Sequence, residues 1–337
     1  MMEKITYLLG AGASFNALPI VKDLPKAISD VVTALEVGPF NQMTVWNDFR
    51  ENNVTTAPPN SLDALALAKS DLKELQKGCE AHLSIDTYAK MLFLTNRKEY
   101  QRMKAATVLF FELYQCLNRK ADMRYDAFLA SIIQDSFDKL PAHVNILSWN
   151  YDRQIEIAYQ KYLDSAGISD AEPSQYLNIY AKGEHVRNYE VDGFCVFKVN
   201  GTVYFLDEQD RSYPLEKSEW NITPHQDIIL SYWNACQKNH NSALSFNWEH
   251  DGTGDRMEGA LSLALRDTSV LVVIGYSFPF FNRTSDTKLL GMMQRLDKIY
   301  IQDPSADDLK ERVRAILPGI KVNTLHDTTQ FYLPHEL

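Results

Sequence analysis

The stretch ITYLLGAGAS, residues 5–14, decides the fold of this chain. Its first half is a short apolar run, which is typical of a strand buried on both faces of a parallel sheet. Gly10 and Gly12 follow at once, although glycine is scarce, with 14 in 337 residues. Such a turn lets the backbone pass close to a bound group, and outward-facing amides before a helix start would suit a phosphate. A tight strand-to-helix turn without a ligand is the alternative.

Working outward, similar apolar runs recur and alternate with helical patterns, which predicts an α/β fold with a Rossmann-like, mostly parallel sheet. The further strand candidates are Val144–Trp149, Phe194–Val199, Val270–Ile274, Ile299–Gln302 and Val322–Leu325. The helical candidates are Leu24–Leu35, Ser61–Lys77, Tyr100–Leu117, Tyr125–Phe137, Arg153–Leu163, Gln226–Cys236, Met257–Arg266, Ser285–Arg295 and Ser305–Ile316.

The spacing of these elements is uneven. Between Leu9 and Val144 there are helical patterns and the polar stretch Glu51–Asn60, but no convincing strand. We therefore expect one domain over residues 1–337 whose sheet core is interrupted by helical insertions. The core would come from 1–35, 141–204 and 268–330, and the insertions from about 36–140 and 205–265. A second irregular region, rich in turn formers, covers 164–193.

Composition excludes several classes of protein. The formal net charge of −10 disfavours a general nucleic-acid-binding surface. Four cysteines in 337 residues cannot form a disulfide framework. The first residues lack the long apolar stretch of a signal peptide, and no run approaches the ~18 apolar residues of a membrane span. We expect a soluble protein of the cytoplasm.

The ordinary dehydrogenase fingerprint fails here. That fingerprint requires G-x-G-x-x-G and an acidic residue about 20 positions further on, at the end of a second strand. Phe15 occupies the third glycine position, and Asp30 lies within a helical pattern. Hydride transfer is therefore disfavoured, whereas a dinucleotide held in another way is not.

The second motif, SWNYDRQIE, follows the strand candidate at 144–149. A parallel strand delivers Asn150 and Asp152 to the carboxyl edge of the sheet, where open α/β sheets bind ligands. Asn150 offers a donor and an acceptor, and Asp152 could hold it or a water in position. The alternative is helix capping by Asn150 or Asp152, with Glu156 in the first turn.

A third motif, KVNGTVYF at 198–205, contains the dipeptide Asn200-Gly201. By itself it indicates a β-turn or hairpin, because Asn-Gly is the favoured turn dipeptide.

Two further strand candidates end in polar residues. The run 270–274 ends before Gly275 and leaves Tyr276 and Ser277 at the predicted ligand edge. Asp303 ends the run 299–302 and precedes Pro304, which could be the first helical residue. Asp303 could accept a ribose hydroxyl or merely cap the helix.

Taken in order, these motifs resemble the sirtuin-like family, and most closely its NAD-consuming members in bacterial antiphage defence. The residues that carry the likeness are GAGAS at 10–14 with Leu18-Pro19, SIDTYAK at 84–90, SWNYD at 148–152, VNG at 199–201, IGYSF at 274–278 and DPS at 303–305. They extend over nearly the whole chain.

The resemblance implies a Rossmann-like sheet that binds NAD as substrate. Asn150 would lie beside the nicotinamide ribose, where the family's asparagine is needed to cleave the glycosidic bond, and Asp152 would support it. The residues implied at the dinucleotide are Gly10, Ala11, Gly12 and Ser14 around the diphosphate, Gly275 and Ser277 from the far strand, and Asp303 at the adenosine end.

The chain also departs from the family pattern. The zinc-binding C-x-x-C pairs of deacetylating sirtuins are missing, because Cys79, Cys116, Cys195 and Cys236 are isolated, so we expect no zinc and no metal site. PIVKDLP at 19–25 stands where sirtuins place an aspartate, phenylalanine and arginine. Both departures favour hydrolysis of NAD over lysine deacetylation.

The most serious departure is Asn200, which stands where the family has a histidine that acts as base or ribose contact. An amide cannot take a proton near neutral pH. Three alternatives follow. In the first, a water and Asp152 suffice for cleavage, with Asn200 in the catalytic group. In the second, His225 or His250 reaches the site. In the third, the protein binds NAD without cleaving it.

The leading expectation is an NAD⁺ glycohydrolase that releases nicotinamide and ADP-ribose and is regulated by assembly or by a phage cue. The alternative is a catalytically idle subunit that binds NAD or ADP-ribose, and a protein deacylase is least favoured. Regions 36–140 and 205–265 would offer surfaces for self-association. The resemblance also implies a defence partner such as an ATPase or an Argonaute-like subunit, with no membrane and no direct nucleic-acid binding.

Overall fold

A computed structural model describes residues 3–37, 45–48, 53–56, 61–118, 120–181, 191, 193–205, 225–238, 242–246, 248–249 and 254–337. The chain divides into two compact units. The sheet unit consists of Met1–Asn16, Ala121–Thr202 and Ser245–Leu337, and the helical unit of Ala17–Lys120 and Val203–Leu244.

In the described part of the sheet unit, seven strands form one parallel sheet. In chain order they are β1 (Lys4–Leu9), β4 (Val144–Ser148), β5 (Ile179–Ala181), β6 (Cys195–Lys198), β9 (Thr268–Ile274), β10 (Lys298–Gln302) and β11 (Lys321–Leu325). Their order in the sheet is β11-β10-β9-β1-β4-β6-β5. This arrangement is α/β and Rossmann-like, which confirms the predicted fold class. All six predicted strands are present, whereas β5 lies in a region expected to be irregular.

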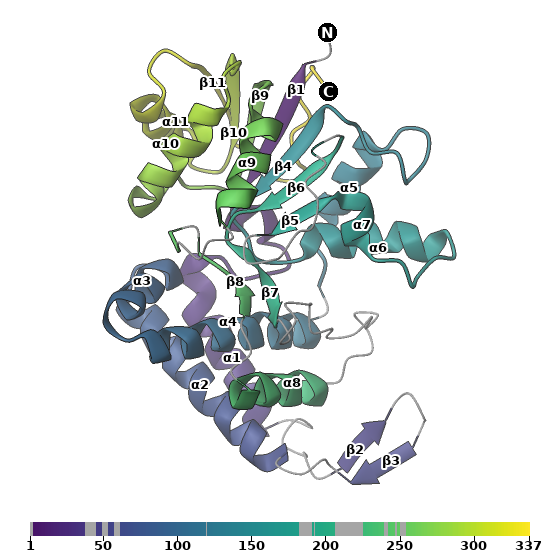
Figure 1. Cartoon of the computed structure of the whole chain (residues 1–337), viewed down its shortest axis with the longest axis vertical. Helices are drawn as coiled ribbons and strands as arrows, with labels where there is room; N and C mark the ends of the chain where they lie inside the picture. Colours follow the sequence, from purple (N-terminus) through teal and green to yellow (C-terminus); the bar gives the residue numbers. More distant parts are fainter. Residues whose placement is uncertain are drawn as a thin grey trace. The chain divides into compact units, whose positions relative to one another are not determined.

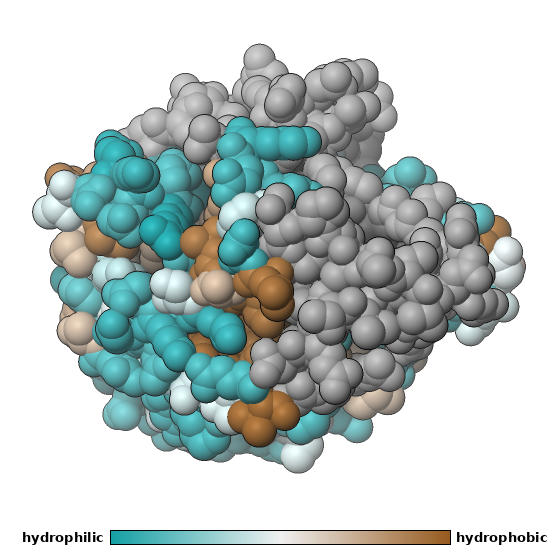
Figure 2. Space-filling model, turned by 90° about the horizontal axis from the view of Figure 1, so that it is seen from below, coloured by the Kyte–Doolittle hydropathy of each residue, from teal (hydrophilic) through white to brown (hydrophobic). Residues whose placement is uncertain are grey.

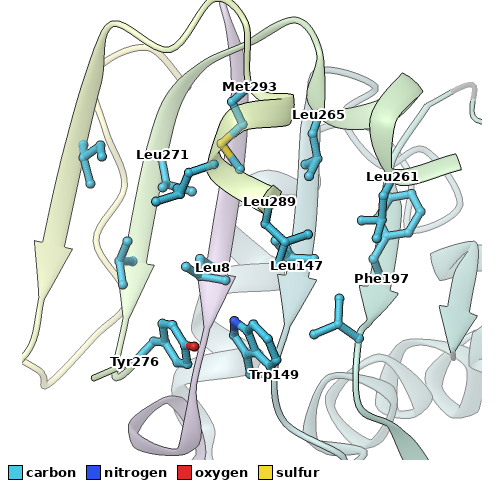
Figure 3. Packing of buried hydrophobic residues seen from close by; sticks show 14 of the residues in the cluster. Leu8, Leu147, Trp149, Phe197, Leu261, Leu265, Leu271, Tyr276, Leu289 and Met293 are labelled. Carbon is cyan, nitrogen blue, oxygen red and sulfur yellow. The ribbon is translucent and has the colours of Figure 1, made fainter. Parts of the chain in front are cut away.

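Helices cover both faces of this sheet (Figure 1). One face packs against α9 (Gly254–Leu265), α10 (Arg283–Met292) and α11 (Ala306–Ile316). The other packs against α5 (Met123–Ile132), α6 (Gln154–Ser165) and α7 (Pro173–Leu177). Because side chains alternate along a strand, Leu8 of β1 belongs to the first core and Tyr7 and Leu9 to the second. Figure 3 shows part of the first core, with Leu8, Leu147 and Leu271 on neighbouring strands.

The order of the strands creates a switch point beside β1. The chain passes from β1 to β4 on one side and later adds β9 on the other side. In open α/β sheets, ligands bind outside the carboxyl ends of the strands at such a point. The loops that follow β1, β4 and β9 are therefore the ones to inspect for function.

The segment after β11 returns across the end of β10. Gln302 Nε2 donates to the carbonyls of Asp327 and Gln330, both at 2.6 Å, and its Oε1 accepts from the Tyr332 N–H at 3.0 Å. Phe331, which lies between Gln330 and Tyr332 in the sequence, packs in the second core and contacts the Tyr125 ring edge-on, with ring centroids 5.0 Å apart.

The helical unit contains α1 (Leu24–Val37), α2 (Ser61–Ala81), α3 (Ile85–Thr95), α4 (Arg97–Asn118) and α8 (His225–Lys238). Helix α2 packs against α1, α4 and α8. Buried Asp71 of α2 accepts hydrogen bonds from Arg102 of α4 and Tyr232 of α8, which ties three helices together.

Several expectations for local structure were wrong. Strands β2 (Val45–Asp48) and β3 (Asn53–Thr56) pair antiparallel in the region where we expected no strand. Helix α3 was not predicted, although Ser84 and Thr87 form a capping box at its start. Helix α5 ends at Ile132 rather than at Phe137.

At Asn200-Gly201, where the sequence indicates a β-turn or a hairpin, the turn is present and the hairpin is not. The chain does turn there, and Gly201 has a φ of +68°, but β6 and the following β7 (Gly201–Phe205) do not pair with each other. Strand β6 belongs to the parallel sheet, whereas β7 pairs with β8 (Ser242–Leu244). The Asn-Gly turn redirects the chain out of the sheet instead of folding it back.

No helix of the described residues is long and apolar enough to cross a membrane. Exposed apolar side chains do occur in the helical unit; among its described residues, the large ones are Val21, Val37, Leu62, Leu83, Met91 and Leu94. The face drawn in Figure 2 shows hydrophobic residues gathered among a larger hydrophilic area.

Candidate functional site

The glycine loop, residues 10–16, packs backbone against backbone on the loop after β9. Gly10 N–H donates to the Ile274 carbonyl and Gly12 N–H to the Gly275 carbonyl, each at 3.0 Å. A Cβ on Gly10 would lie 2.6 Å from the Gly275 carbonyl oxygen, and one on Gly12 would lie 2.7 Å from the Gly275 Cα. Gly275 itself has a φ of +60°, in the left-handed region. These three glycines are therefore explained by the close approach of two loops.

Two features of this loop differ from the expected turn, whose amides would face outward before a helix start; the assignment of Gly10, Ala11, Gly12 and Ser14 to a diphosphate stays a prediction. The N–H groups of Gly10 and Gly12 point into the protein, and Ala13 N–H donates back to the Gly10 carbonyl at 2.8 Å. The loop continues into a single 3-10 turn, Ala11–Ser14, and not into an α-helix. A turn this short supplies little of the dipole that favours anions. Of the loop residues assigned to a diphosphate, Ala11 is exposed.

Ser14 is buried, with 1% of its surface exposed. Its Oγ lies 3.0 Å from the Tyr125 hydroxyl and accepts from Asn150 Nδ2 at 3.4 Å. The Ser14 hydroxyl also lies close enough to Asp152 to lower the pKa of that carboxyl group in part. Ser14 therefore links the Tyr125 hydroxyl to the Asn150 amide, and its contact with a diphosphate stays a prediction.

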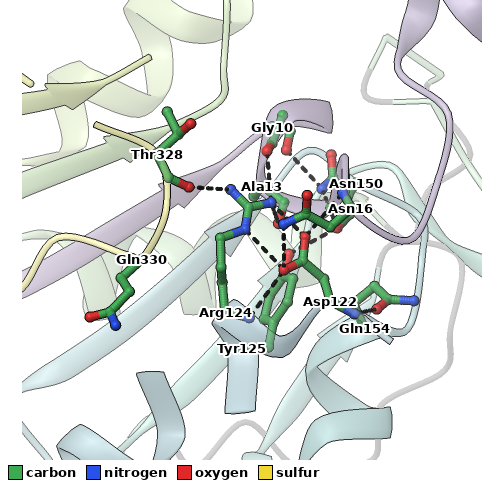
Figure 4. Close-up of polar contacts among 12 residues, drawn as sticks. Gly10, Ala13, Asn16, Asp122, Arg124, Tyr125, Asn150, Gln154, Thr328 and Gln330 are labelled. Carbon is green, nitrogen blue, oxygen red and sulfur yellow. Dashed lines mark hydrogen bonds and ion pairs between the residues drawn. The ribbon is translucent and has the colours of Figure 1, made fainter. Parts of the chain in front are cut away.

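Asn150 lies directly after β4 and reaches back to the glycine loop. Its Nδ2 donates to the Gly10 carbonyl at 2.9 Å (Figure 4). Because a carbonyl only accepts, this contact fixes which amide atom is the nitrogen. Within the described part of the chain, the Oδ1 of Asn150 has no hydrogen-bond donor. The side chain is thus held at a defined angle with an acceptor available to a ligand.

Asp152 partly follows the capping alternative. Its Oδ1 accepts from the Gln154 N–H at 2.9 Å, at the start of α6, where the N-cap residue Arg153 makes no side-chain cap. Burial raises the pKa of Asp152, although the Gln154 N–H and the nearby Lys198 ammonium lower it in part. Among the described residues, Asp152 makes no direct hydrogen bond to Asn150, and the Ser14 hydroxyl lies close to both side chains; support of Asn150 by Asp152 stays a prediction.

Asn200 is 5% exposed and holds the backbone beside Asn150. Its Nδ2 donates to the Trp149 carbonyl at 3.0 Å, and its own carbonyl accepts from the Ser245 N–H at 3.0 Å. Of the two histidines considered as substitutes, His225 belongs to α8 of the helical unit, and burial lowers its pKa to about 4. His250 lies outside the described residues.

The far-strand residues are placed at the carboxyl ends of β9 and β10. Ser277 is exposed, and its carbonyl accepts from Arg312 Nη1 at 2.7 Å. Asp303 Oδ1 accepts from the Ser305 N–H at 2.8 Å, which is a capping contact before α11. Pro304 precedes the N-cap Ser305, so it is not the first helical residue.

Tyr276 turns inward rather than toward a ligand. Its ring stacks on Trp149 with centroids 5.4 Å apart, and the two rings lie side by side in Figure 3. Its hydroxyl donates to Asp286 Oδ1 at 2.8 Å and accepts from Asn282 Nδ2 at 3.1 Å.

A buried ion pair beneath the glycine loop was missed by the sequence analysis. Arg124 and Asp122 are 4% and 1% exposed, and Arg124 Nη2 lies 2.5 Å from Asp122 Oδ2. Arg124 Nη2 also donates to the carbonyls of Gly12 and Ala13, at 3.2 and 2.9 Å. Desolvation would raise the pKa of Asp122, but the hydrogen bonds from Arg124 outweigh it and hold that pKa below its ordinary value.

The sequence does carry a faint signal for this pair. Asp122 stands immediately before α5 and its Oδ1 accepts from the Arg124 N–H at 3.1 Å, as an N-cap residue does. In the sequence, however, KADMRYD at 120–126 has the alternating charges of an exposed turn. Only the long-range contacts of Arg124 with residues 12 and 13 distinguish a buried ion pair from an exposed turn.

No family model matches this chain. A search of curated proteins finds no match either. The functional argument therefore depends on the side chains at this edge of the sheet.

The fold brings together Gly10, Gly12, Ser14, Asn150 and Gly275 through direct contacts. Asp152 lies beside them at the start of α6. Asn200 adjoins them through the Trp149 carbonyl, whereas Ser277 and Asp303 follow neighbouring strands. Among the described residues, no group of three or more His, Cys, Asp or Glu side chains could hold a metal ion. The chemistry available is an oriented amide, a buried carboxyl group and backbone dipoles.

Proposed function

We propose that this chain is an NAD⁺ glycohydrolase that cleaves NAD⁺ to nicotinamide and ADP-ribose. The candidate site lies at the switch point beside β1, which is where open α/β sheets bind dinucleotides. The resemblance to the sirtuin-like NAD-consuming proteins supplies the reaction. In bacteria, such an enzyme would act as a regulated effector of antiphage defence by depleting NAD.

The observation that carries the proposal is the fixed orientation of Asn150. With Nδ2 anchored on the Gly10 carbonyl at 2.9 Å, Oδ1 is the atom available to a ribose hydroxyl. Loss of nicotinamide leaves an oxocarbenium-like sugar, which needs oriented dipoles and an ordered water more than a strong nucleophile. An amide locked in one orientation meets that need without reorganisation.

Asp152 would contribute the negative charge and help to order the attacking water. Its raised pKa, which burial causes, brings the carboxyl group closer to a range in which it can accept a proton. This role replaces the histidine that the family has at the position of Asn200.

The test is nicotinamide release from NAD⁺ by the purified protein and by Asn150→Ala. We expect the rate to fall about 100-fold or more, the usual cost of removing one oriented electrostatic group. Asn145→Ala is the matched control. Asn145 is a buried amide of β4 that donates to the Ala264 carbonyl at 3.1 Å, so its loss costs similar stability. Equal losses of activity in both variants would contradict the assignment of Asn150.

Asn200 favours a second candidate, a catalytically idle subunit that binds NAD or ADP-ribose. Its amide is used to hold the Trp149 carbonyl and cannot act as a base. In that case the wild-type protein binds ADP-ribose in calorimetry without releasing nicotinamide, and Asn200→His gains release. Activity in the wild-type protein would exclude this candidate. A protein deacylase is least favoured, because the four cysteines are isolated in the sequence.

Regulation would involve a homo-oligomer or a defence partner such as an ATPase or an Argonaute-like subunit. The exposed apolar side chains of the helical unit, such as Leu83 and Leu94, are compatible with such an assembly. Sedimentation of the purified chain with and without NAD tests for the homo-oligomer.

A further inference from the structure

We infer that Arg124 is the positioning residue of the glycine loop and that it couples this loop to the C-terminal segment 327–332. This inference deepens the proposed function. The effect of Arg124 on NAD binding rests on that function, whereas the coupling of the two chain segments by Arg124 does not.

The first step is the number of chain segments that one guanidinium joins. Arg124 Nε and Nη2 hold Asp122, and Nη2 reaches the carbonyls of Gly12 and Ala13. On its other side, Nη1 donates to the Thr328 carbonyl at 3.3 Å (Figure 4). Segments more than 100 positions away on either side are therefore bound to the same planar group.

The second step is the contact of the guanidinium with two aromatic rings. Its carbon lies 4.3 Å from the centroid of the Phe15 ring in the glycine loop and 5.2 Å from that of Phe331 in the C-terminal segment. The same two segments thus supply both the carbonyls and the aromatic rings. A planar, five-donor group can satisfy this arrangement, whereas a lysine ammonium cannot.

The third step links Arg124 to Asn150. Asp122, which Arg124 holds, also accepts from the Asn16 N–H and Nδ2, each at 3.3 Å, and so closes the far end of the glycine loop. The near end is the Gly10 carbonyl, which anchors Asn150. A loop that Arg124 no longer holds would leave Asn150 without a fixed partner.

A positioning role predicts a particular kinetic signature. If the competent loop conformation is only partly populated, the apparent dissociation constant rises by the inverse of that fraction, while the bound enzyme is unchanged. We expect Arg124→Lys to raise KM for NAD about tenfold with kcat within about twofold of the wild-type value. A merely structural role would lower the amount of active enzyme, and hence the apparent kcat, at constant KM.

The structural part is tested by amide hydrogen exchange without ligand. We expect Arg124→Lys to increase exchange in residues 10–16 and 327–332 together, by about tenfold, and not in the central strands. Arg314→Gln is the control, because it removes an arginine from an exposed ion pair with Glu311 on α11. Unchanged exchange in either segment, or an increase spread evenly over the sheet, would overturn the inference.

A second variant protects the test if Arg124→Lys does not fold. Phe15 is 45% exposed, so Phe15→Ala leaves the core intact. We expect this change in the glycine loop to increase exchange in residues 327–332, because the Phe15 and Phe331 rings both contact the Arg124 guanidinium. An increase confined to residues 10–16 would contradict the coupling.

The two proposals fail in different ways. If the wild-type protein neither binds ADP-ribose nor releases nicotinamide, the proposed function fails, and exchange alone decides the role of Arg124. If the wild-type protein cleaves NAD and Arg124→Lys has the same KM, the positioning role fails and the proposed function stands.

Discussion

At the scale of single residues, the contact between Gly10 and the loop after β9 has the least room for change. A Cβ at Gly10 would meet the Gly275 carbonyl and the Tyr276 Cα at 2.6 Å, and backbone atoms cannot turn aside. We expect Gly10→Ala to lower the free energy of unfolding by about 1–3 kcal/mol, the usual cost of overpacking, measured by urea denaturation. Gly291→Ala in α10 is the control, because its Cβ meets nothing within 4 Å. It should leave stability equal or raise it by about 0.5–1 kcal/mol. A Gly10→Ala variant as stable as the control would contradict the packing argument.

At the scale of elements, the loop after β9 and the start of α10 enclose a buried acid. Asp286 is 2% exposed, accepts from the Tyr276 hydroxyl, and burial raises its pKa to about 7. Since its pKa is about 3.9 in the unfolded chain, the folded state holds the proton more tightly. The stability from this group is therefore full below about pH 4 and falls as the pH rises through 7. We expect Asp286→Asn to raise the free energy of unfolding at pH 8 by more than about 1 kcal/mol and to change little at pH 4. Asp135→Asn, in an exposed loop, serves as the control, and a gain that is independent of pH would refute the assignment.

The elements also show what a sequence can and cannot reveal. The strands of the sheet were predictable because apolar residues such as those of Ile5–Leu9 are buried on both faces and leave a clear pattern. Strand β5 was missed, since three residues within a polar region carry no periodicity. At Asn200-Gly201 the turn was predictable and the choice between a simple turn and a hairpin was not, because the turn dipeptide fixes the local bend but not the strand with which the next residues pair. Asn150 was placed at the correct edge, whereas Arg124 was missed, since its partners are carbonyls more than 100 positions away.

At the scale of the whole molecule, the sheet unit closes across both interruptions of its chain. Asn16 and Asp122 are hydrogen-bonded where residues 17–120 leave it, and the Asn200 carbonyl accepts from Ser245 where residues 203–244 leave it. Both of its apolar cores are built from its own residues. We expect a chain of 1–16, 121–202 and 245–337, joined by short Gly/Ser linkers, to fold and unfold cooperatively in urea, followed by circular dichroism. A version in which Leu147 is replaced by Asp is the control for a collapsed but unfolded chain. A spliced protein without a cooperative transition would show that the sheet unit depends on the rest.

The close approach of Gly10, Gly12 and Gly275 limits which substitutions these three positions can accept during evolution. Two backbones in contact exclude every larger residue, so these positions should be invariant among its descendants whether or not any nucleotide is bound. Conservation of these glycines would therefore indicate the packing of the two loops. A descendant that no longer binds a ligand would still keep all three. Selection for ligand binding should instead appear as conservation of Asn150 and of the exposed Ala11, because the packing of the two loops does not constrain these two positions.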